Sequence, residues 1–97
     1  LGGLTIAHLA LRRATPADAP KVDGFTPEQR FFLAFAQGWR EKTRPESLRQ
    51  QVQSDPHAPP VYRVLGPLAN TAAFAEAFQC NANAAALRPA AKRTVIW

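Results

Sequence analysis

Apolar residues recur at helical spacing in several stretches of the chain, and proline-rich or polar segments separate these stretches. The first stretch predicts a helix over about residues 2–13, because Leu4, His8 and Leu11 lie three or four residues apart. Residues 14–24 contain two prolines and a glycine but no periodic pattern. They are therefore expected to form a loop.

The next stretch has the clearest helix signature in the chain, over about residues 27–43. Thr26 can cap the helix, Pro27 suits the first helical position, and Gln29 stands three residues after Thr26, as in a capping box. The body of this helix carries an apolar face that is expected to lie in the core, formed by Phe31, Phe32, Phe35, Ala36 and Trp39.

A second, more polar helix is predicted over about residues 45–54, with Leu48 and Val52 on its inward face. The segment 55–60 holds three prolines, which fix φ and keep the preceding residues extended, so it is expected to be rigid and non-helical. Residues 61–65, V-Y-R-V-L, predict a short strand that a Gly-Pro pair closes.

The last predicted helix covers about residues 71–79, where Phe74 and Phe78 have i, i+4 spacing. Residues 81–92 predict a loop, and the apolar end 94–97 is expected to pack into a core. The predicted fold class is therefore mainly α, with three to four helices and one short strand. The length of 97 residues allows at most one domain.

Composition and charge narrow the function classes. Twelve Lys and Arg against seven Asp and Glu give a net charge of +5, which is compatible with nucleic-acid binding. The basic residues are scattered, however, and the densest stretch, 40–49, also contains two glutamates, which is typical of a solvated helix surface. One cysteine excludes an internal disulfide framework and a Cys-rich zinc site, and the two histidines match no metal-ligand spacing.

The proline-bounded segment holds the candidate chemistry. His57 lies between Pro56 and a Pro-Pro pair, so its backbone has little freedom, and Asp55 is close enough in sequence to orient the imidazole. Arg63 follows six residues later, and a His and an Arg that converge would stabilise developing negative charge. The same spacing also fits an exposed turn with Arg63 in a salt bridge, and the pattern alone names no reaction.

A longer set of co-linear motifs adds a family resemblance. They are Leu1–Leu4, Asp23–Leu33, Ala36–Gln37, Trp39–Arg40, Lys42–Glu46, Leu48–Arg49, Asp55–His57, Tyr62–Val64, Gly66–Leu68, Asn70, Phe74, Glu76–Phe78, Cys80 and Ile96–Trp97. In these motifs the chain resembles the C-terminal end of the neprilysin and endothelin-converting-enzyme family of zinc metallopeptidases, in its bacterial endopeptidase branch. The resemblance covers everything except residues 14–22 and 81–92. Among the departures, Ala58 stands where the family usually has Ser.

The resemblance implies the C-terminal helical part of a thermolysin-like (gluzincin) catalytic domain. It implies an exported or membrane-anchored zinc metalloendopeptidase that cuts small peptides inside an enclosed cavity. In the family, two His of an H-E-x-x-H helix and a Glu of a later helix hold the zinc. By the same resemblance, His57 stabilises the oxyanion, Asp55 orients His57, and Arg63 binds a substrate carbonyl.

The chain contains no H-E-x-x-H, and by the resemblance Leu1 lies just past the third zinc ligand while Trp97 lies at the family's C-terminus. We therefore expect no metal ligands, no catalytic zinc and no peptide cleavage for this chain alone. The expected partners are peptide substrates and the remainder of the same catalytic domain, with no nucleic acid. The alternative is a basic helical module that binds nucleic acid or a partner protein.

Overall fold

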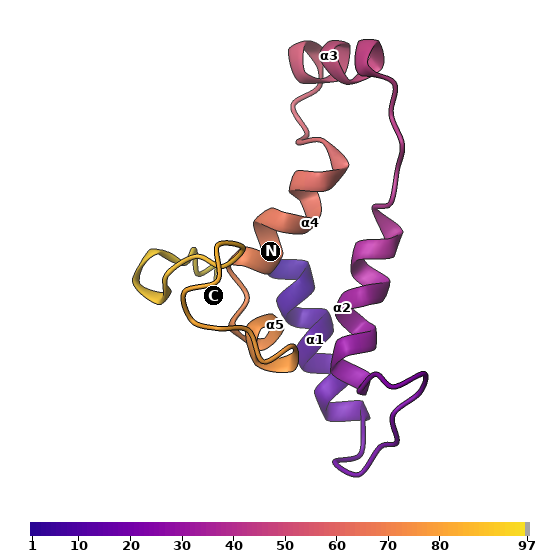
Figure 1. Cartoon of the computed structure of the whole chain (residues 1–97), viewed down its shortest axis with the longest axis vertical. Helices are drawn as coiled ribbons and strands as arrows, with labels where there is room; N and C mark the ends of the chain where they lie inside the picture. Colours follow the sequence, from indigo (N-terminus) through magenta and orange to yellow (C-terminus); the bar gives the residue numbers. More distant parts are fainter. Residues whose placement is uncertain (97) are drawn as a thin grey trace.

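The computed structural model describes residues 1–96, and these form a mainly helical unit, which confirms the predicted mainly α class. The described residues form five α-helices instead of the predicted three to four. The helices of the described chain are α1 (Gly2–Ala14), α2 (Pro27–Gly38), α3 (Pro45–Ser54), α4 (Pro60–Ala69) and α5 (Ala72–Ala77), followed by a 3-10 turn over Ala90–Lys92. Figure 1 shows α2 and α4 as two limbs that lead up to α3, while α1 and α5 gather in the lower body. The molecule is elongated, with extents of 47 × 32 × 24 Å.

The capping box that begins α2 is confirmed. The Thr26 hydroxyl accepts a hydrogen bond from the Gln29 backbone N–H at 3.2 Å, and the Gln29 side-chain oxygen accepts one from the Thr26 N–H at 2.9 Å. The amide nitrogen of the same Gln29 side chain donates to the Ala77 carbonyl at 2.8 Å. One glutamine therefore caps α2 and also ties it to the end of α5.

The core lies where α1, α2, α4 and α5 meet. Phe32 of α2 is 1% exposed and packs with Leu4 of α1 and Leu68 of α4. Its ring also meets the Phe74 ring of α5 edge-on, with 5.5 Å between centroids. Helix α3 contributes no buried residue, because it stands away from this core at the top of the two limbs (Figure 1).

The predicted strand over residues 61–65 is wrong, because these residues lie in α4. Pro60 is the first residue of the helix, where its missing N–H costs nothing and its fixed φ favours a helical start. The N–H groups of Tyr62 and Arg63 both donate to the Pro59 carbonyl, at 2.9 and 3.2 Å. The two valines and the tyrosine favour a strand only weakly, and packing of the helical face against the core overrides that preference.

Helix α2 ends at Gly38, five residues before the predicted end. The segment that follows, 39–44, is rich in charge and has no apolar face to bury, so little would stabilise a continued helix. Arg44 is extended, at φ −65° and ψ 145°, as expected of a residue that precedes proline. An extended linker therefore separates the well-packed α2 from the exposed α3.

The end of the chain runs beside α4 but is not buried. The Thr94 N–H donates to the Asn70 side-chain oxygen at 2.8 Å, which holds the tail at the C-terminal end of α4. Val95 is nevertheless 80% exposed, so the prediction that the apolar end packs into a core fails for the described part of it. Trp97, which belongs to the same prediction, lies outside the described residues. No helix within residues 1–96 combines the length and apolar character needed to cross a membrane.

Candidate active site

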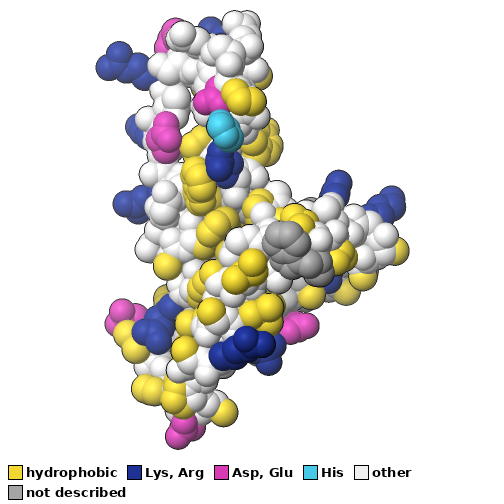
Figure 2. Space-filling model, turned by 180° about the vertical axis from the view of Figure 1, so that it is seen from behind, with side chains coloured by type: hydrophobic (Ala, Val, Ile, Leu, Met, Phe, Trp, Pro, Cys, Tyr) yellow, Lys and Arg dark blue, Asp and Glu magenta, His cyan; other side chains and the backbone are white. Residues whose placement is uncertain are grey.

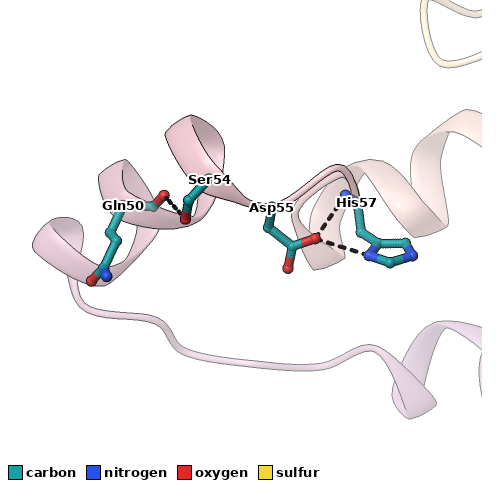
Figure 3. A network of polar contacts seen from close by, with 4 residues as sticks. All are labelled: Gln50, Ser54, Asp55 and His57. Atoms are coloured by element: carbon teal, nitrogen blue, oxygen red, sulfur yellow. Dashed lines mark hydrogen bonds and ion pairs between the residues drawn. The ribbon is translucent and has the colours of Figure 1, made fainter.

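Asp55 and His57 form a tight side-chain turn at the end of α3. The Asp55 carboxylate oxygen Oδ1 accepts a hydrogen bond from the His57 backbone N–H at 2.8 Å and lies 2.8 Å from His57 Nδ1 (Figure 3). Asp55 precedes a proline and is extended, at φ −100° and ψ 127°, which turns its side chain back over the next two residues. With Nδ1 held by the carboxylate, Nε2 is the ring nitrogen left to face a ligand.

The electrostatics of this turn favour an ionised Asp55. The backbone N–H of His57, together with its side chain, holds the pKa of the Asp55 carboxyl below its ordinary value, and the positive charge of Arg63 adds to the effect. The His57 imidazole remains 66% exposed, so Asp55 orients it without enclosing it. At neutral pH the carboxylate is therefore present to fix the orientation of the ring.

We expect the Asp55 carboxyl to titrate below the ordinary range of an aspartate. Because its pKa in the folded chain is lowered, the stability that this turn contributes is present above the pKa of the unfolded chain. That contribution is lost as the pH falls through the lower folded value. A carbon-13 NMR titration of the side-chain carboxyl measures this directly.

The matched control for the titration is His57→Ala. It keeps the backbone N–H, which is the largest cause of the shift, and removes only the imidazole, so the pKa of Asp55 should return only part of the way. A titration midpoint at or above the ordinary aspartate value in the unsubstituted chain would show that the turn does not hold in solution.

Arg63 lies in the first turn of α4 and contacts Trp39, the residue that directly follows α2 and caps its C-terminus. The guanidinium carbon lies over the indole ring, 4.3 Å from its centroid, which is within the range of a cation–π contact. The sequence pattern predicts Trp39 only as part of the apolar core face. Its position at the end of that face, beside a charged segment, is the sequence signal for a contact with a cation.

His57 and Arg63 share one open cleft of about 410 Å³ between the limbs and the start of α1. The cleft is lined by Leu1, Gly3, Leu4, Phe35, Trp39, Pro56, His57, Ala58, Arg63 and Pro67. On the face shown in Figure 2, hydrophobic side chains form a band that runs from the limbs into the body, and the Lys and Arg side chains are spread around it. The structure therefore places the His and the Arg on one open surface of mixed polarity, with Asp55 at its edge.

Side chains that could hold a metal ion lie apart from one another within residues 1–96. Within residues 1–96, no three His, Cys, Asp or Glu side chains come together in a group that could hold a metal ion. His8, the second histidine, is buried instead in the core, where its ring stacks on Phe32 at 5.3 Å. Its Nε2 lies 3.5 Å from a Glu28 oxygen, which is a contact between α1 and α2 and not part of the cleft.

Comparison with known proteins identifies relatives over nearly the whole chain. The model of the family described as Peptidase family M13 matches residues 1–95. An endothelin-converting enzyme homolog of Locusta migratoria is 40% identical over 83 residues, which is 81% of this chain and 11% of the relative. Neprilysin-3 of Drosophila melanogaster is 42% identical over 84 residues, again 81% of this chain and 11% of the relative.

Solved structures agree with these sequence matches. The chain superimposes on the zinc metalloprotease Zmp1 of Mycobacterium tuberculosis in complex with an inhibitor, with a TM-score of 0.93 and 39% identity. This match covers 100% of this chain and 15% of Zmp1. The open state of Zmp1 gives a TM-score of 0.91 at 38% identity over 99% of this chain. The chain thus spans between about a tenth and a sixth of the length of these relatives, and it belongs to peptidase family M13, together with the neprilysins and endothelin-converting enzymes.

Proposed function

We propose that this chain is the C-terminal part of a zinc metalloendopeptidase that hydrolyses peptide bonds of small peptides. The observation that carries the proposal is the shared cleft, in which His57 and Arg63 converge while Asp55 fixes the imidazole. Membership of peptidase family M13 supports the reaction class. The described residues 1–96 hold no group of side chains that could bind a metal ion, and the family resemblance assigns the zinc ligands to other parts of the full-length protein.

In this proposal His57 stabilises the negative charge that develops on the substrate carbonyl oxygen. Attack on a peptide carbonyl creates an oxyanion, and a preorganised donor stabilises that charge more than it stabilises the neutral carbonyl. Asp55 acts as a positioning residue, because its carboxylate accepts hydrogen bonds from the His57 backbone N–H and from Nδ1–H. In the imidazolium form both ring nitrogens donate, so Nε2–H is then the donor toward the substrate. The imidazole is exposed, so it can reach a substrate without rearranging the fold.

Arg63 has the complementary role of binding a substrate carbonyl. A guanidinium carries several N–H donors in a fixed planar fork, which suits a carbonyl or carboxylate oxygen. Its position half-buried in the same cleft sets it beside the peptide that His57 would contact. The proposed partners are therefore peptide substrates and the remainder of the same catalytic domain, in an exported or membrane-anchored protein.

Zinc content and peptidase activity test the proposal that the zinc ligands lie outside this chain. The 97-residue chain alone should hold no tightly bound zinc and cleave no peptide, whereas the full-length protein should hold zinc and show peptidase activity that a chelator abolishes. One tightly bound zinc ion per isolated chain, or chelator-sensitive cleavage by it, would contradict the proposal. Strong, salt-dependent DNA binding by the isolated chain would favour the basic-module alternative instead.

A further inference from the structure

We propose that Trp39 is a positioning residue for Arg63, whose guanidinium it holds over its indole ring so that the N–H groups face the substrate cleft. This inference rests on the proposed function of Arg63, and it adds that carbonyl binding by Arg63 depends on Trp39. It starts from one contact, the 4.3 Å separation between the guanidinium carbon and the indole centroid. Both side chains line the same cleft, so the contact is part of its wall.

The described contact of the Arg63 guanidinium is with the Trp39 ring. Among residues 1–96, no carboxylate lies within ion-pair distance of the guanidinium, and the arginine side chains with hydrogen bonds there are those of Arg88 and Arg93. Asp55 is near enough for the charge of Arg63 to influence its pKa but does not pair with it. The guanidinium of Arg63 is therefore held by an aromatic face and keeps its donors.

This arrangement suits a group that must bind a carbonyl. A carboxylate partner would also orient an arginine, but it would occupy two N–H donors and cancel the positive charge. An aromatic ring attracts the cation through its quadrupole and takes none of the donors. The long side chain of Arg63 thus loses rotamer freedom before the substrate arrives, which lowers the ordering cost of binding.

The helix that precedes Trp39 is well fixed. Trp39 caps the C-terminus of α2, and its N–H donates to the Ala36 carbonyl at 3.1 Å. The rest of α2 is anchored by Phe32 in the core and by the hydrogen bond from Gln29 to α5. Arg63 is in turn fixed through the first turn of α4, so two helices bring the indole and the guanidinium together.

A double-mutant cycle in the full-length protein tests the inference. Trp39→Leu should lower kcat/KM for a peptide substrate by about 3- to 30-fold, the range expected for losing a cation–π contact, and the loss should fall mainly on KM. In an Arg63→Ala background the same substitution should change kcat/KM by less than about twofold, because Trp39 then has no guanidinium to position. An equal loss in both backgrounds would overturn the inference and leave Trp39 as a packing residue.

Phe35→Leu is the matched control, because Phe35 lies one turn earlier, on α2, and lines the same cleft, while within residues 1–96 no cation lies over its ring. Its effect should be the same with and without Arg63. If Trp39→Leu does not fold, Trp39→Phe keeps an aromatic face of weaker attraction, should lose less activity, and should couple to Arg63 in the same sense. Near-normal activity of Arg63→Ala would refute the proposed role of Arg63 itself. An impaired Arg63→Ala with additive Trp39 effects would refute only the inference.

Discussion

Replacing His57 with alanine in the full-length protein is expected to lower kcat by about 10²- to 10³-fold, the cost of removing one oxyanion donor. The loss should fall on kcat more than on KM, because the donor is worth most once negative charge has developed on the carbonyl oxygen. Steady-state kinetics on a peptide substrate measure both constants. Near-normal kcat would refute the role assigned to His57.

The exposure of His57 makes this result easy to interpret. The imidazole is 66% exposed and is not part of the core cluster, so its removal should change the free energy of unfolding by no more than about 0.5 kcal/mol. A loss of activity with unchanged thermal unfolding then belongs to the chemistry and not to the fold. His8→Ala is expected to lower the free energy of unfolding, because His8 is 6% exposed and stacks on Phe32 in the core.

Local chemistry explains which parts of this arrangement could be predicted from the sequence. The Thr26–Gln29 capping box and the Asp55–His57 contact join residues two or three positions apart, so the sequence alone brings their atoms close. The residue types and their spacing, together with the family resemblance, suggest the roles of Asp55, His57 and Arg63, and these roles stay predictions. The structure adds that His57 and Arg63 line one cleft and that Asp55 holds His57 at its edge.

The failures have a common physical origin in tertiary packing. Residues 61–65 have a composition that fits either a strand or a helix, and the core decides between them by accepting Val64 and Leu68 from one helical face. Trp39 follows α2 and Arg63 lies in α4, with all of α3 between them in the sequence. No rule of residue spacing predicts a contact over that separation. The apolar end of the chain stays exposed because its anchor is a backbone hydrogen bond to Asn70 and not side-chain burial.

Arg63→Ala is expected to lower kcat/KM by about 10- to 100-fold, with a larger part of the change in KM than for His57→Ala. A hydrogen bond from a charged group contributes about 1.5–3 kcal/mol, and a carbonyl accepts it both before and during the reaction. Steady-state kinetics on one peptide with both variants make the comparison. An Arg63→Ala protein whose KM is unchanged would show that the guanidinium does not bind the substrate in the ground state.

Two further variants separate the geometry of Arg63 from its charge. Arg63→Lys keeps the positive charge but loses the planar fork, so it should recover only part of the lost kcat/KM. Arg13→Ala removes the same charge from an exposed position on α1 that does not line the cleft, and it should stay within about twofold of the parent. If Arg63→Ala and Arg13→Ala lowered kcat/KM by the same factor, the overall positive charge would explain the effect. A loss confined to Arg63 instead assigns the effect to the position of its guanidinium in the cleft that His57 also lines.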